Sequence, residues 1–163
     1  MAGGILGRRV PTEVRDVVPK GARVLAWDRT DPAGFVVATR ERFVCTVPDL
    51  DVAWVQVLGA AWDDPILELS LLRDQASVTW RCHLVDARVL PQVVRERIMQ
   101  SLLVQHYEVL ADGRGVRFVA RRDPDSNESF WQRVVDPGVD VTQPEVVERL
   151  AAVQVELSAT YGV

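Results

Sequence analysis

Lysine is nearly absent from this sequence: Lys20 is the only lysine among its 19 basic residues, and all the others are arginine. Long apolar runs are missing too. No stretch reaches the ~18 residues that a membrane-spanning helix needs, so we expect no membrane insertion. The first residues lack the pattern of a signal peptide, and a cytoplasmic location is the expected default. With a net charge of −4, the chain also lacks the basic surface that nucleic-acid binding requires, so nucleic acid is not an expected partner.

Catalytic and cofactor motifs are missing as well. The sequence contains no Gly-rich nucleotide fingerprint, P-loop, His-Glu-x-x-His motif or nucleophile elbow. Asp123, Asp125 and Asn127 have the alternating spacing of a calcium loop, but Glu128 stands where that loop needs glycine. We therefore predict no catalytic residue, no cofactor and no metal site.

Cys45 and Cys82 are the only cysteines, and each lies in an apolar row of a predicted strand. A buried free cysteine behaves as a small apolar residue, so two buried reduced thiols are the simplest interpretation. A disulfide between neighbouring strands is the alternative, which a reducing cytoplasm disfavours.

What the sequence does contain is a hairpin that can be aligned residue by residue. Within 66–73, Leu67, Leu69 and Leu71 alternate with Glu68, Ser70 and Leu72, and apolar and polar residues alternate throughout 77–84. One face is therefore apolar and the other polar, as in an antiparallel sheet with one face on a core and one in water. A turn at 74–75 gives these opposite pairs: Leu71 with Val78, Leu69 with Trp80, Leu67 with Cys82 and Glu68 with Arg81. We expect Trp80 in the core and the Glu68–Arg81 pair in solvent.

The hydrophobic period changes after this hairpin. Leu90, Val94, Ile98 and Leu102 recur every four residues, which predicts an amphipathic helix over 91–104 lying on a sheet. The other predicted elements are a helical turn from Thr12; strands at 23–28, 35–39, 42–47, 52–62 (with a bulge at Gly59) and 130–135; a hairpin of 106–111 with 116–121; and a final helix opened by a capping box at Thr142 and Glu145.

These elements predict an α+β fold in three segments. Residues 1–20 form an N-terminal tail, 21–104 a strand-rich domain closed by its helix, and 105–163 a C-terminal extension of a hairpin, a strand and a helix. No flexible linker precedes the extension, and so few residues make a marginal core by themselves. We expect the extension to pack on the same unit. A homodimer is the alternative use of the final helix's apolar stripe, which consists of Val146, Val147, Leu150, Val153 and Leu157.

The order of six short strands followed by a helix resembles a pleckstrin-homology-like (PH-like) domain over roughly residues 23–104. Segment 34–43, which contains Thr39-Arg-Glu-Arg42-Phe, looks like the Thr-x-x-Arg-apolar hairpin of bacterial PH-like and GRAM-like domains, and 54–63 resembles their following strand. The whole chain, with its Asp-Pro-Gly-Val-Asp at 136–140, is similar to a group of uncharacterised actinobacterial cytoplasmic proteins.

This resemblance implies an antiparallel β-barrel or two-sheet sandwich capped by the helix. In PH-like domains that bind phosphoinositides, the loop between the first two strands usually carries basic residues. Here residues 28–32 supply two acids and one arginine, which argues against that ligand.

Arginine forms the one cluster that suggests a binding site. Arg114, Arg117, Arg121 and Arg122 lie within nine residues, and guanidinium groups bind carboxylates and phosphates through paired donors. Glu108, which can face Arg117 across the hairpin, would be an internal partner instead. Solvated or internally paired arginines are therefore the competing interpretation.

The tryptophans offer a second possible surface. Trp54 and Trp62 share one side of the predicted strand 52–62 unless Gly59 bulges. Burial in the core is the simplest interpretation, whereas an exposed tryptophan would mark a partner surface.

The sequence favours a non-catalytic cytoplasmic protein-interaction or adaptor module whose partner is a protein or peptide. Such a partner could bind along an open sheet edge or beside the capping helix. The alternative is a small-anion-binding protein or enzyme that uses the arginines of 114–122. An apolar strip along an edge strand would favour the first function, and an open basic cleft the second.

Overall fold

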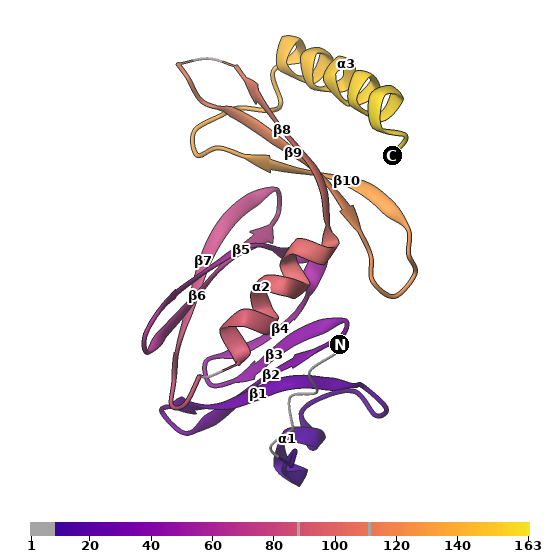
Figure 1. The fold of residues 1–163 in the computed structure, drawn as a ribbon. Coiled ribbons are helices and arrows are strands. Elements are labelled where there is room, and N and C mark those ends of the chain that lie inside the picture. Colours follow the sequence, from indigo (N-terminus) through magenta and orange to yellow (C-terminus); the bar gives the residue numbers. More distant parts are fainter. Residues whose placement is uncertain (1–8, 88, 111) are drawn as a thin grey trace.

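The structure is a computed structural model that describes residues 9–87, 89–110 and 112–163. Two antiparallel sheets make up most of it (Figure 1). Residues 1–8 of the expected tail lie outside the described residues. In the rest of the tail, α1 (Thr12–Asp16) confirms the predicted helical turn, and its Val14 is completely buried. This part of the tail is therefore packed against the fold.

The larger sheet has seven strands in the order β4-β3-β2-β1-β7-β6-β5. The strands are β1 (Val24–Asp31), β2 (Gly34–Thr39), β3 (Arg42–Thr46), β4 (Asp49–Ala53), β5 (Val57–Asp63), β6 (Ile66–Arg73) and β7 (Ala76–Leu84). Because β4 and β5 are both edges, the sheet is not closed, which excludes a fully closed barrel and leaves the sandwich alternative untested. The sheet nevertheless curves around a core, since Phe43 on β3 contacts Trp80 on β7 edge to face, with ring centroids 5.6 Å apart.

The β6–β7 hairpin has the register predicted from the sequence, including Leu69 opposite Trp80 and Glu68 opposite Arg81. The two turn residues, Asp74 and Gln75, have φ angles of +48° and +64°, the left-handed backbone typical of a two-residue hairpin turn. The apolar face is covered along only part of its length. Trp80 is half-buried and Val78, nearer the turn, is 46% exposed.

The predicted strand 52–62 is wrong in its middle. A single 3-10 turn, η1 (Trp54–Gln56), separates β4 from β5. The two strands lie at opposite edges of the sheet, so the chain has to leave one edge before it can pair at the other. The predicted bulge is present, because the pairing with β6 shifts between Val57 and Gly59.

Helix α2 (Leu90–Ser101) covers the core of the larger sheet with Leu90, Val93, Val94 and Ile98. It ends three residues before the predicted limit at residue 104. Residues 102–104 instead begin β8, where Leu102 pairs with Arg121 and Val104 with Ala120. Pairing with β9 therefore places residues 102–104 in a strand, although the four-residue apolar repeat of the local sequence favours a helix there.

The smaller sheet has the order β10-β9-β8 and is covered on one face by α3 (Pro144–Tyr161), as Figure 1 shows. Its strands are β8 (Leu102–Val109), β9 (Gly115–Arg122) and β10 (Ser129–Val135). Its separate core contains Val116, Phe118, Leu150, Val153 and Leu157. The apolar stripe of α3 therefore packs on the smaller sheet, which belongs to the same extension. Val147 of that stripe is 50% exposed.

Two local predictions in the extension are wrong. Tyr107, and not Glu108, is opposite Arg117, so the pairing in which Glu108 faces Arg117 across the hairpin does not form. The capping box does not form either. Gln143 is the N-cap of α3 without a side-chain cap, while Thr142 bonds to Asp140.

Backbone and arginine contacts connect the two sheets. Val135 N donates to Gln75 O at 2.6 Å, and the Arg121 guanidinium donates to Val57 O at 2.9 Å. Because each sheet has its own hydrophobic cluster, folding of 21–104 and 105–163 as one unit stays a prediction.

Candidate functional site

The structure separates the four arginines of the predicted anion site. Arg114, Arg117 and Arg122 are exposed, whereas Arg121 is only 1% exposed. Arg114 lies in the turn before β9 and contacts Asp112 at 3.4 Å. An anion site on this segment would need all four guanidinium groups to converge on one surface. Because Arg121 is buried, the four do not form such a group.

Arg121 lies at the junction of the two sheets. Its Nη1 donates to Ser101 Oγ, at the end of α2, at 2.7 Å, and its Nη2 donates to Val57 O, at the start of β5. Burial lowers the pKa of Arg121 to about 10, because the charged form loses its water. This side chain holds α2 and β5 together and is not presented to a surface ligand.

Arg114 and Arg117 lie near the Asp136 carboxylate. Asp136 Oδ2 accepts hydrogen bonds from Tyr107 Oη and from Gly115 N, the latter at 3.0 Å. These bonds, together with the nearby Arg117 and Arg114 charges, lower the pKa of Asp136, and the bond to Asp136 raises the pKa of Tyr107. The two arginines thus already have an internal anion close by.

Glu108 is not the partner of Arg117. It accepts hydrogen bonds from Arg149 of α3, with Nη2 at 2.6 Å, and lies 3.4 Å from His106 Nε2. Glu108 therefore ties β8 to α3. Anion binding by the exposed Arg114, Arg117 and Arg122 stays a prediction.

The calcium-like spacing in the loop after β9 has a structural explanation. Asp123 Oδ1 accepts hydrogen bonds from the backbone N–H groups of Asp125 and Ser126, at 2.7 and 3.2 Å. This carboxylate therefore closes a turn. In the ranges that the structure describes, no group of three or more His, Cys, Asp or Glu side chains is placed to hold a metal ion.

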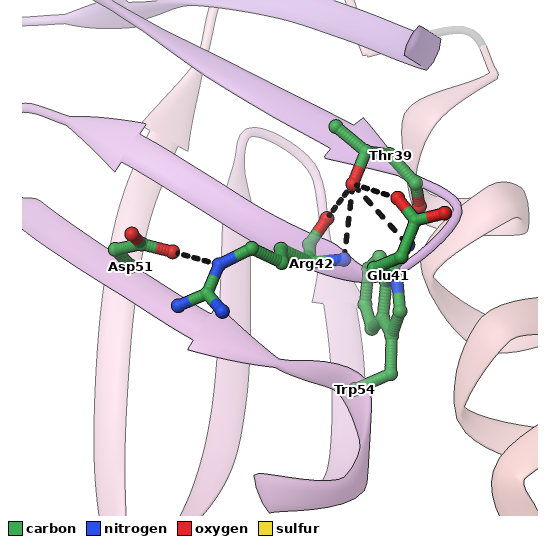
Figure 2. Close-up of polar contacts among 5 residues, drawn as sticks. All are labelled: Thr39, Glu41, Arg42, Asp51 and Trp54. Atoms are coloured by element: carbon green, nitrogen blue, oxygen red, sulfur yellow. Dashed lines mark hydrogen bonds and ion pairs between the residues drawn. The ribbon is translucent and has the colours of Figure 1, made fainter. Parts of the chain in front are cut away.

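The Thr-x-x-Arg hairpin is also explained by local contacts (Figure 2). Thr39 Oγ1 accepts from the backbone N–H groups of Arg42 (3.0 Å) and Glu41 (3.3 Å) and lies 3.1 Å from Arg42 O, to which it donates. Trp54 Nε1 donates to Thr39 O at 3.0 Å, and Arg42 forms an ion pair with Asp51 at 2.7 Å. The motif closes the β2–β3 turn and fixes η1 against it.

A groove between β5 and α2 is the clearest candidate binding surface. It has a volume of about 470 Å³, which lies in the range of small ligand sites. Trp62 of β5 and Met99 of α2 are 38% and 60% exposed. Arg95 is the one charged residue among the described residues that line it; the others are Leu58, Gly59, Ala60, Ala61, Trp62, Leu67, Pro91, Ile98, Met99, Leu102 and Gln105.

The two edges of the larger sheet differ in charge. On β4, Asp49 and Asp51 are exposed and Arg42 pairs with Asp51, and charges of this kind discourage another strand from pairing. On β5, residues 58–62 carry no charge, and the one charged residue of the strand is the exposed Asp63 at its end. The β5 edge, beside the groove, is therefore the edge where another strand could pair. Trp62 lies on this strand and is exposed, as expected of a tryptophan that marks a partner surface.

No protein-family model matches this chain, and no curated protein or solved structure matches it either. Among the described helices, none is both long and apolar enough to cross a membrane. The groove is thus assigned from its own geometry.

Proposed function

We propose that this chain is a non-catalytic, cytoplasmic protein-interaction module with a PH-like larger sheet, and that it binds an extended peptide in the groove between β5 and α2. The observation that carries the proposal is an edge strand whose residues 58–62 carry no charge, beside a groove with one charged residue, Arg95, on its lining. In strand addition, backbone hydrogen bonds supply affinity and alternate side chains enter the neighbouring pocket.

The groove also indicates the composition of the peptide. Trp62, Met99 and Ile98 offer apolar surface to side chains that point toward α2, whereas Arg95 is the only described charge on the lining. We expect a peptide with apolar residues at alternate positions and an acidic residue opposite Arg95. The small-anion alternative has less support, because Arg121 is buried and Asp136 lies close to Arg114 and Arg117.

A random-peptide phage library selected on the immobilised full chain tests the proposal. Enriched peptides are then measured by titration against the wild type and against Met99→Lys and Ala61→Lys, which place a charge on each wall of the groove. Val155→Lys is the matched control, since Val155 is 71% exposed on α3. We expect both groove variants to weaken binding by about tenfold or more, and the control to bind normally.

Hydrogen exchange gives a second measurement. A peptide that adds to β5 should slow the exchange of backbone amides in 58–62, because their outward groups become hydrogen-bonded. Enriched peptides that bind the groove variants as tightly as the wild type, or that need Arg117 instead, would overturn the proposal. So would a selection that enriches no binding peptide.

A further inference from the structure

A cleft of about 640 Å³ lies between the two sheets. It is lined on one side by Ser70 and residues 74–77 of the β6–β7 hairpin, and on the other by Arg117 of β9 and Val134 of β10. Small-ligand sites often lie at interfaces between packed units, and their volumes are of this size. Among its described lining residues, the cleft shares only two, both on β5, with the groove beside α2. It is therefore a second candidate site.

The alternation of side chains along β9 explains why Arg117 lies on the wall of this cleft. Side chains 117, 119 and 121 share one face of the strand, and α3 packs on the opposite face, where Phe118 lies. Val119 and Arg121 are nevertheless only 2% and 1% exposed. The larger sheet covers them, as the hydrogen bond from Arg121 to Val57 O shows. Because Arg117 is exposed, it is the residue of this face that a ligand in the cleft can reach.

The polar side chains of the cleft have unused hydrogen-bonding capacity. Ser70 and Ser77 alternate with the apolar residues of the hairpin, so they lie on its outer face, toward the cleft. In the part of the chain that the structure describes, four side chains of the lining form no hydrogen bond or ion pair with another residue: Ser70, Asp74, Ser77 and Arg117. A ligand would therefore find donors and an acceptor that no protein group occupies.

The charges of the lining favour a ligand that carries both signs. Arg117 is the cation of the described lining, and Asp74 and Asp136 are its anions. A simple anion would meet two carboxylates near one guanidinium group, and a simple cation would meet the guanidinium group. Asp136 already accepts hydrogen bonds from Tyr107 Oη and Gly115 N, so Asp74 is the carboxylate left for a ligand. A zwitterion can satisfy Arg117 and Asp74 together.

We propose that the cleft binds a small zwitterion with an apolar body, the chemistry that a free amino acid or a dipeptide supplies. The ligand's carboxylate accepts hydrogen bonds from the Arg117 guanidinium, and its ammonium group donates to the Asp74 carboxylate. The apolar body packs against Val134 and Val141 of the lining. Because Arg117 and Asp74 belong to different sheets, the bound ligand connects the sheets, and its binding raises the melting temperature of the chain.

The test titrates the full chain with L-leucine and with leucyl-leucine by calorimetry and follows the melting temperature. Two analogues of leucine are the matched ligands: isocaproate lacks the ammonium group, and isoamylamine lacks the carboxylate. We expect saturable binding of at least one zwitterion, and binding of both analogues that is at least about tenfold weaker. The tighter of the two zwitterions identifies the amino acid or the dipeptide as the ligand class.

Two variants test the charged contacts. Arg117→Gln and Asp74→Asn should each weaken binding of the zwitterion by about tenfold or more, and asparagine tolerates the left-handed backbone of residue 74, whose φ is +48°. Arg122→Gln is the matched control, because Arg122 is exposed on the same strand but does not line the cleft. Met99→Lys alters the groove beside α2 and not this cleft. Both controls should bind the zwitterion normally.

Four results would overturn the proposal. The first is no saturable binding of either zwitterion up to about 10 mM, and the second is an analogue that binds as tightly as leucine, which would show that only one charge is recognised. The third is wild-type affinity in both charge variants, and the fourth is loss of binding in Met99→Lys, which would assign the ligand to the groove. The comparison with the analogues uses the wild-type chain alone, so it decides the question even if a variant does not fold.

Discussion

Replacing Thr39 with valine removes the hydroxyl that closes the β2–β3 turn and keeps the shape of the side chain. Thr39 is 1% exposed, so its Oγ1 has the protein contacts of Figure 2 and little contact with bulk water. Valine leaves the N–H groups of Glu41 and Arg42 and the Arg42 carbonyl without this partner. Each such bond contributes about 0.5–1.5 kcal/mol.

Because Glu41 and Arg42 are only half-buried, water can replace part of what valine removes. We expect Thr39→Val to lower the free energy of unfolding by about 2 kcal/mol, which corresponds to a fall in melting temperature of roughly 4–8 °C. Thermal and urea unfolding followed by tryptophan fluorescence would measure it, and native-state hydrogen exchange would report on the Arg42 amide.

Thr39→Ser is the matched control, since serine keeps the oxygen and loses only a methyl group. Its Arg42 amide should stay protected, whereas the valine variant should exchange faster at that amide. A valine variant that melts within about 1 °C of the wild type, with the Arg42 amide equally protected, would refute the assignment of the motif to turn closure.

Three further results are expected. The Glu68–Arg81 pair should contribute only about 0.2–1 kcal/mol in a double-mutant cycle, because both side chains are partly exposed; a larger coupling would contradict this. Trp80→Ala should destabilise by about 3 kcal/mol in urea unfolding, and unchanged unfolding would show that Trp80 does not support the core. Because Asp136 has a lowered pKa, its stabilisation is present above the ordinary aspartate pKa of about 3.9 and is lost as the pH falls through the lowered value. In Asp136→Asn, the free energy of unfolding should therefore fall less steeply as the pH is lowered below about 4. An unchanged pH dependence in this range would contradict the lowered pKa of Asp136.

Sequence alone was sufficient where neighbouring segments pair through a short turn. The register of the β6–β7 hairpin is predicted to the residue, because a two-residue turn and the alternation of apolar residues along both strands favour one register. The existence of α2 and α3 is also predicted, since each carries a repeating apolar stripe. Where the turn is longer, the pairing was predicted less well, since Tyr107 and not Glu108 is opposite Arg117 in the β8–β9 hairpin.

The candidate sites were predicted less well than the fold, because they depend on contacts between distant segments. Nothing near Arg121 in the sequence indicates that it is buried against Val57 and Ser101. Only the strand order shows that β5 is an open edge beside α2. The exposure of Trp62 agrees with one of the two interpretations of the tryptophans, that an exposed one marks a partner surface.

By itself, the sequence determined most of the segments that are strands or helices and which face of most of them is apolar, because these properties follow from side-chain periodicity and turn residues a few positions apart. The tertiary structure decided where the 52–62 segment breaks, where α2 ends, which edge stays unpaired and that Arg121 is buried between α2 and β5. These outcomes depend on pairing and packing between residues far apart in the chain, which local periodicity does not encode.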